Sequence, residues 1–235
     1  HRAGRRIMTV ILSNLQAVRR AVADAASAAG RSEASVHLLA VSKTFPAAAV
    51  REACRAGQMA FGENYLQEAL DKMEALRDLP LEWHFIGPIQ SNKTRPIAEN
   101  FAWVHGVDRL KVAQRFAAQR PGHLPPLNVC LQVNVSGEAS KSGVARDEVA
   151  PLAQEVARLP RLRLRGLMAI PAPADDEAAQ RRPFAQLRHL LEDLRRQGLP
   201  LDTLSMGMSH DFPAAIAEGA TIVRIGTAIF GARTY

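Results

Sequence analysis

The sequence predicts an α/β protein, namely a single (β/α)8 TIM barrel with an extra N-terminal helix. Short apolar runs alternate with stretches of helical period along the 235 residues, which is typical of a parallel sheet joined by helices. Eight apolar runs occur, and this number favours a closed barrel over an open sheet. The predicted strands cover residues 36–43, 59–64, 82–88, 101–108, 128–135, 164–170, 203–209 and 221–231.

Helical stretches lie between these strands. One begins at Pro46, because a proline in the first turn of a helix loses no hydrogen bond, and it ends at Gly57. Apolar residues at helical spacing predict further helices over 66–76 and 187–194. Another helix precedes the first strand and ends at Gly30, and it would complete the ring of helices around the barrel.

The predicted domain organisation is one barrel domain over residues 8–235. Residues 1–7 precede the first methionine, Met8, and are interpreted as an upstream extension or a cloning remnant. The N-terminal stretch is basic and then briefly apolar, but Ser13 and Asn14 interrupt it, which argues against a signal peptide. The sequence has no apolar run of membrane-spanning length, so we expect no membrane partner.

Composition narrows the function classes. The formal net charge is +7, yet the arginines are scattered along helical faces and aromatic residues make up only 5%, which argues against nucleic-acid binding. The two cysteines, Cys54 and Cys130, form no CxxC pair, so we expect buried free thiols and a cytoplasmic location. The histidines lack metal-ligand spacing, so no metal site is expected.

Functional groups of such barrels gather at the carboxyl ends of the strands. Lys43 ends the first predicted strand. Partial desolvation lowers the pKa of an amine and increases the neutral fraction that can attack an aldehyde, so Lys43 could form a Schiff base. A solvated lysine at a strand end explains the same pattern, and the residue alone favours that second interpretation.

The last strand and the loop before it carry a possible anion site. Gly226 allows the backbone to approach a phosphate, Thr227 adds an N–H and a hydroxyl, and Arg224 shares a strand face with Gly226. The alternative is a structural arginine paired with an acid across the barrel mouth. Ser209 precedes a predicted helix, where it could bind an anion or simply cap the helix, as could Asp211.

Other polar residues at the strand ends leave their roles open. Asn64 could bind a ligand, whereas Glu63 could anchor a neighbouring strand. His84 is more typical of a hydrogen-bonded core histidine than of a catalyst. Lys141, in a loop rich in Ser and Gly, could accept an aldehyde from Lys43, but a solvated loop lysine is the simpler interpretation.

A set of motifs distributed over residues 8–235 identifies a family. The segments "LLAVSKTFP", "FGENYLQEALDK", "WHFIGPIQSNK", "KSGV", "LRGLMAIP", "LSMGMS" and "VRIGTAIFGAR" together resemble the YggS/PROSC family of pyridoxal phosphate homeostasis proteins. The resemblance implies a barrel similar to that of alanine racemase and pyridoxal 5′-phosphate (PLP) as cofactor. It also implies a Schiff base on Lys43.

The resemblance assigns further cofactor-binding residues and no catalytic residue. Arg224 would face the pyridine nitrogen, Ser209, Gly226 and Thr227 would hold the phosphate, and Met208 and Asn64 would line the ring pocket. One departure from the family pattern is His210, where an acidic or small residue is more usual.

The implied function is cytoplasmic PLP homeostasis by a monomer that holds PLP, delivers it to apoenzymes and has no catalytic turnover. An arginine that donates to the pyridine nitrogen keeps this nitrogen unprotonated, which weakens the ring as an electron sink. Racemases also need a base on each face of the substrate, and alanine racemase-like enzymes take one from a second domain, which we do not expect here. The alternative function is a PLP-dependent amino-acid racemase or lyase.

Overall fold

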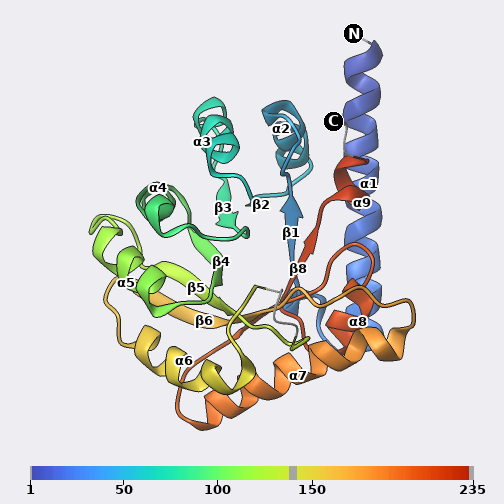
Figure 1. The fold of residues 1–235 in the computed structure, drawn as a ribbon. Coiled ribbons are helices and arrows are strands. Elements are labelled where there is room, and N and C mark those ends of the chain that lie inside the picture. The colour runs from blue at the N-terminus through green and yellow to red at the C-terminus, as the bar shows by residue number, and fades with distance from the viewer. Residues whose placement is uncertain (1, 138–141, 233–235) are drawn as a thin grey trace.

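The protein folds as a closed barrel of parallel strands in sequence order, as predicted (Figure 1). The computed structural model describes residues 2–137 and 142–232, with side chains from residue 10 onwards. The strands are β1 (His37–Val41), β2 (Ala60–Glu63), β3 (Glu82–Phe85), β4 (Trp103–Val107), β5 (Leu127–Gln132), β6 (Leu162–Met168), β7 (Thr203–Ser205) and β8 (Ile222–Ile225). Each strand pairs in parallel with the next, and β8 pairs with β1.

Helices surround the barrel and follow the strands in turn (Figure 1). They are α1 (Arg2–Ala28), α2 (Ala47–Arg55), α3 (Leu66–Ala75), α4 (Thr94–Asn100), α5 (Leu110–Gln119), α6 (Val149–Ala157), α7 (Glu177–Arg196), α8 (Phe212–Ala217) and α9 (Thr227–Phe230). The N-terminal helix α1 packs against α2, α8 and α9, so it completes the ring as the sequence predicts. Its backbone includes residues 2–7, ahead of Met8.

The core has two layers, because alternate side chains of each strand point to opposite faces. The outer layer fills the space between strands and helices and contains most of the buried apolar side chains, among them Leu15, Phe61 and Phe184. The inner layer lies inside the barrel. It consists of Leu39, Val41, Ile86, Trp103, Cys130, Met168 and Ile222.

The predicted strand over 221–231 is too long. The strand β8 ends at Ile225, and residues Thr227–Phe230 form the short helix α9 with Gly226 at its N-cap. The backbone of Gly226 lies against β1, since a Cβ there would be 3.0 Å from the carbonyl oxygen of Val41. A side chain at this position would be in tight contact with the neighbouring strand, which would have to shift by a few tenths of an ångström.

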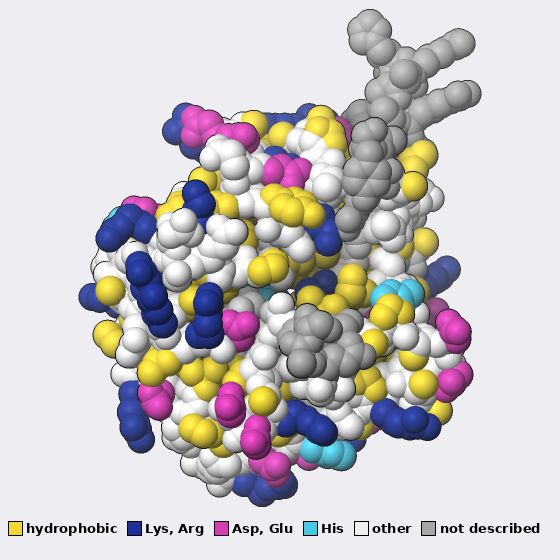
Figure 2. Space-filling model, in the orientation of Figure 1, with side chains coloured by type: hydrophobic (Ala, Val, Ile, Leu, Met, Phe, Trp, Pro, Cys, Tyr) yellow, Lys and Arg dark blue, Asp and Glu magenta, His cyan; other side chains and the backbone are white. Residues whose placement is uncertain are grey.

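Both cysteines are buried and free, as predicted. Burial raises the pKa of the Cys130 thiol to about 12, so this thiol stays protonated and unreactive. In the described part of the chain, no helix has the length and apolar character needed to cross a membrane. On the face drawn in Figure 2, Lys and Arg side chains are spread over several helices with Asp and Glu between them.

Gly166 provides a test of barrel closure between β6 and β7. A Cβ at this position would lie 1.8 Å from the carbonyl oxygen of Thr203, so Gly166→Ala forces the two strands apart. We expect the free energy of unfolding to fall by about 3 kcal/mol in chemical denaturation. The control is Gly122→Ala, where no atom lies within 4 Å of the added Cβ; equal losses in the two variants would contradict this view of the strand contact.

Candidate functional site

The residues that the sequence singles out lie on one arc of the barrel rim. Lys43 and Asn64 follow β1 and β2, Met208 and Ser209 follow β7, and the segment 224–227 runs from β8 into α9. The strands β7, β8, β1 and β2 are consecutive around the barrel. The closure therefore brings together residues from both ends of the chain.

Lys43 lies half-buried in a tight turn after β1. The N–H of Phe45 donates to the carbonyl of Ser42 at 3.1 Å, which closes the turn. Thr44 has a φ of 70°, a left-handed conformation that is unfavourable for a β-branched residue. The N–H of Thr44 donates to Glu68 Oε1 at 2.7 Å, and this bond from α3 helps to hold the turn.

A buried ion pair between α3 and β2 supports the same turn. Lys72 Nζ of α3 donates to the carbonyl of Ser42 at 2.7 Å and lies 3.0 Å from Glu63 Oε2. The hydroxyl of Ser42 donates to the Glu63 carboxylate. Burial raises the pKa of Glu63, while the Lys72 ammonium and the Ser42 hydroxyl oppose this shift. Glu63 thus anchors the neighbouring strand β1, one of the roles considered from the sequence.

Arg224 lies on β8, directly opposite Leu39 of β1, and its side chain is buried inside the barrel. Its Nη1 donates to Ser205 Oγ at 2.7 Å, and its Nη2 donates to the carbonyl of Ala169 at 3.0 Å. Among the described residues it forms no ion pair, so the predicted alternative of an acid partner across the mouth is wrong. Burial lowers the pKa of the Arg224 guanidinium to about 10, which leaves it charged at neutral pH.

Two hydroxyl groups face each other beside α9. Thr227 Oγ1 lies 3.4 Å from Ser209 Oγ, on the exposed side of the rim. The first N–H groups of a helix have no intrahelical acceptor, and Thr227 is the first residue of α9. Hydroxyl and N–H donors therefore converge at this point of the rim.

The loop between β7 and α8 differs from a simple helix cap. Asp211 occupies the N-cap position but makes no side-chain bond to the helix. Its Oδ1 accepts instead from the N–H of Met208 at 2.8 Å, and this bond fixes the loop that carries the half-buried Met208 and Ser209. His210 is half exposed, with its Nε2 3.4 Å from Asp211 Oδ2.

Asn64 has a buried acceptor without a partner. Among the described residues, no donor lies within hydrogen-bond distance of its side-chain oxygen Oδ1. Leaving a buried acceptor unpaired costs about 1–3 kcal/mol, so such an atom is unusual unless a ligand or water pairs with it. The backbone of Asn64 is packed tightly against Gly87, where a Cβ would lie 2.6 Å from its carbonyl oxygen.

Sequence reasoning missed several residues that support the site. The sequence alone predicts that Lys72 is an ordinary lysine on a helix surface. In the structure it is buried and forms an ion pair with Glu63. The only local signal is Glu68, four residues earlier on the same helix face. Ser205 was missed entirely as the acceptor for Arg224, since it comes from a different strand.

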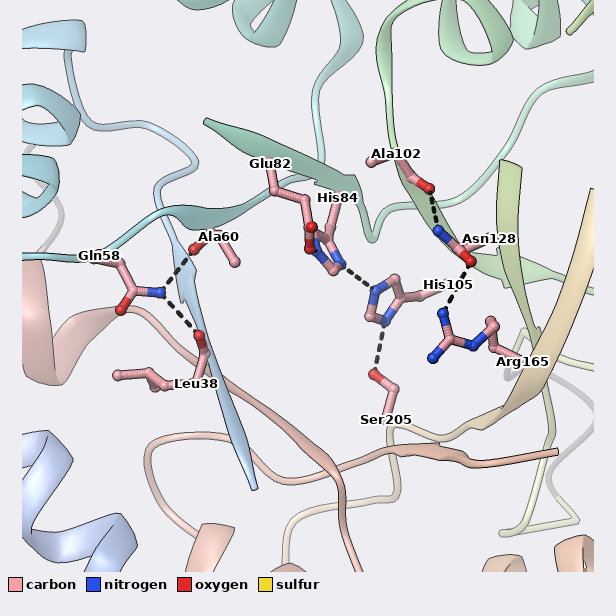
Figure 3. A network of polar contacts seen from close by, with 10 residues as sticks. All are labelled: Leu38, Gln58, Ala60, Glu82, His84, Ala102, His105, Asn128, Arg165 and Ser205. Atoms are coloured by element: carbon pink, nitrogen blue, oxygen red, sulfur yellow. Dashed lines mark hydrogen bonds and ion pairs between the residues drawn. The ribbon is translucent and has the colours of Figure 1, made fainter. Parts of the chain in front are cut away.

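His84 is a satisfied core histidine, as predicted. Its two ring nitrogens lie 2.7 Å from Glu82 Oε1 and 2.9 Å from His105 Nε2 (Figure 3). In the described part of the chain, no cluster of His, Cys, Asp and Glu could hold a metal ion. Lys141 lies outside the described residues.

A hollow of about 1140 Å³ lies at the opposite, N-terminal end of the barrel. Its polar groups bind one another. Arg165 bonds to Asn128 (Figure 3). It also bonds to Asp202 and lies over the ring of Trp103 at 4.5 Å. Gln58 donates to two backbone carbonyls. These groups are already paired, so the hollow offers weaker recognition chemistry than the rim.

Comparisons with known proteins relate the whole chain to one family. Residues 13–234 match the family described as alanine racemase, N-terminal domain. A pyridoxal phosphate homeostasis protein of Pseudomonas aeruginosa is 68% identical over 228 residues, which cover 97% of this chain and 98% of that protein.

Solved structures agree in fold. PipY of Synechococcus elongatus with PLP bound is 39% identical, with a TM-score of 0.83 over 94% of this chain and all of that one. Alanine racemase of Corynebacterium glutamicum is 20% identical, with a TM-score of 0.68 over 94% of this chain and 60% of that one. This last likeness concerns the barrel alone.

Lys72→Met tests the support beneath the Lys43 turn. The substitution leaves Glu63 buried without its ammonium partner, so we expect the free energy of unfolding to fall by about 3–5 kcal/mol. The double variant Glu63→Gln/Lys72→Met removes both charges and should lose less than the single one. Chemical denaturation measures both, with the exposed Lys111→Met on α5 as control. A Lys72→Met loss no larger than that of the control would contradict the buried pair.

Proposed function

Because the chain belongs to the alanine racemase N-terminal-domain family and, within it, to the pyridoxal phosphate homeostasis proteins, we propose that it binds PLP at the rim as a Schiff base on Lys43. The observation that carries this proposal is the arc formed by β7, β8, β1 and β2. It puts an amine, a buried guanidinium and a cluster of hydroxyl and N–H donors at the same part of the rim.

Lys43 supplies the nucleophile. Its amine would hold PLP through the aldehyde, with a C=N bond in place of the C=O bond and the aldehyde oxygen released as water. Hydrolysis reverses the reaction and returns both amine and aldehyde, so no other reagent is needed. The bonds from Glu68, Glu63 and Lys72 hold Ser42 and Thr44, the residues on either side of Lys43, so the backbone from which the amine extends is fixed.

Arg224 supplies a donor for the pyridine nitrogen. Guanidinium donates hydrogen bonds but does not give up its proton at neutral pH, so a ring nitrogen facing it stays unprotonated. PLP supplies an electron sink to amino-acid chemistry, and this sink is weak when the ring nitrogen carries no proton. That pairing disfavours carbanion chemistry and so supports binding over turnover.

The remaining site residues suit the other groups of the cofactor. Ser209 and Thr227 offer hydroxyls for the phosphate, and the first N–H groups of α9, which follow Gly226, add further donors. Asn64 has the unpaired buried oxygen Oδ1, which suits an amide that faces a ligand. Met208 adds a half-buried apolar side chain for the ring.

The proposed role is PLP homeostasis in the cytoplasm. A reversible Schiff base keeps the reactive aldehyde bound and still allows release to PLP-dependent apoenzymes. The curated relative from Pseudomonas aeruginosa carries the name of a homeostasis protein, which supports a role in handling PLP over a catalytic one. We propose that the chain acts as a monomer, since its barrel closes with strands of one chain.

Borohydride reduction tests the Schiff base. Reduction of the PLP-loaded protein should fix a pyridoxyl group on the peptide that contains Lys43, and peptide mass mapping locates it. The Lys43→Ala variant should lose the visible absorption band of the Schiff base. The control Lys111→Ala, exposed on α5, should keep it. A label on another peptide, with Lys141 the first to inspect, would refute Lys43 as the attachment site.

Deuterium incorporation tests the absence of turnover. We expect no deuterium at Cα when the PLP-loaded protein is incubated with a panel of L-amino acids in deuterated water, beyond the level given by free PLP. The measurement is mass spectrometry of the recovered amino acids. Incorporation at enzyme-like rates, lost in Lys43→Ala, would support the alternative function of a racemase or lyase.

A further inference from the structure

A line of hydrogen bonds crosses the interior of the barrel and ends at Arg224. Glu82 Oε1 lies 2.7 Å from His84 Nε2, and His84 Nδ1 lies 2.9 Å from His105 Nε2 (Figure 3). His105 Nδ1 lies 2.7 Å from Ser205 Oγ, which also accepts from Arg224 Nη1 at 2.7 Å. We call these five residues the interior relay. They come from β3, β4, β7 and β8, so only barrel closure assembles them.

The interior relay joins a buried cation to a half-exposed anion. The side chain of Glu82 is 52% exposed at the N-terminal end of the barrel, whereas His84, His105, Ser205 and Arg224 are buried. Burial lowers the pKa of His84. Burial, together with the neighbouring His84 and Arg224, holds the pKa of His105 well below its usual value. Both rings are therefore neutral at physiological pH, and each carries one N–H.

The direction of every bond follows from the two ends of the relay. The Glu82 carboxylate can only accept, so His84 carries its proton on Nε2 and accepts at Nδ1 from His105 Nε2. His105 Nδ1 is then bare and accepts from the Ser205 hydroxyl. Guanidinium can only donate, so a lone pair of Ser205 Oγ accepts from Arg224.

This direction is also favoured by charge. Each donor in the relay points away from the positive end at Arg224 and towards the negative end at Glu82. Hydrogen bonds aligned in one direction polarise one another in a low-dielectric interior. The relay therefore has one preferred arrangement of protons, and the carboxylate at the far end of the barrel helps to maintain it.

We propose that Ser205, His105 and His84 are positioning residues that hold the Arg224 guanidinium in its cofactor-binding orientation, with Glu82 fixing the proton order from the other end of the barrel. Among the described residues, Ser205 Oγ and the carbonyl of Ala169 are the two acceptors of Arg224. These two acceptors occupy one N–H of each terminal nitrogen. The remaining N–H groups of the guanidinium are left to donate to a ligand. The assignment rests on the proposed function, since PLP is the ligand that Arg224 would meet.

The first test examines the proton order in the full chain before PLP is added. Nitrogen NMR of the imidazole rings distinguishes protonated from bare nitrogens, and His84→Gln and His105→Gln variants assign the two signals. We expect a bare Nδ1 and a protonated Nε2 on both rings. A proton on Nδ1 of either ring would overturn the proposed relay. This readout is independent of cofactor binding.

The second test measures the dissociation constant of PLP by spectroscopic titration. Ser205→Ala removes the anchor of Arg224, and we expect the constant to rise about tenfold, equivalent to about 1.4 kcal/mol. Thr203→Ala is the matched control, because Thr203 is a buried hydroxyl residue on the same strand outside the relay. The dissociation constant of PLP for Thr203→Ala should stay within about twofold of the wild-type value.

A second variant, Glu82→Gln, tests the relay independently, so that the test does not depend on correct folding of Ser205→Ala. Glu82→Gln keeps an acceptor for His84 but removes the charge, at a half-exposed site remote from the rim, and should weaken PLP binding about threefold. Unchanged binding in both variants would overturn the positioning role alone, because a merely structural relay affects stability and not affinity. A wild-type chain that bound no PLP would overturn the proposed function and the positioning role together.

Discussion

The pairing of β1 with β8 is the contact on which the rest of the structure depends. His37 pairs with Ile222 and Ala40 with Ile225, so the first and last strands lie side by side. Closing so long a loop costs chain entropy, which the two core layers on either side of the sheet offset. Lys43 and Arg224 share one rim only because this pairing forms.

Buried charge is handled in two different ways around the rim. Lys72 and Glu63 neutralise each other beneath the Lys43 turn, and their role is to hold backbone. Arg224 is bonded to neutral acceptors, Ser205 Oγ and a carbonyl, and forms no ion pair among the described residues. The contrast separates a cation paired with a carboxylate from one whose hydrogen-bond acceptors are neutral.

Much of the fold can be predicted from the sequence, because the positions of strands and helices depend on the local periodicity of apolar residues. Each predicted strand overlaps an observed one, although β5 begins one residue and β6 two residues before the predicted start. The helix after Pro46 begins within one residue of the predicted start. The error at 221–231 arose because the apolar run continues past Gly226 into α9, and periodicity alone does not distinguish a short helix from a strand. The close approach of Gly226 to Val41 is a tertiary contact that marks the true end.

The sequence by itself determined the alternation of strands and helices, and with the family motifs it identified the rim residues from Lys43 to Thr227. Only the tertiary structure decided how these residues are supported. Lys72 became a buried partner of Glu63, and Ser205 became the acceptor of Arg224 at the end of the interior relay. The physical reason is that a hydrogen-bond partner is chosen by distance in space. In a parallel barrel, neighbouring side chains come from strands that are far apart in the chain.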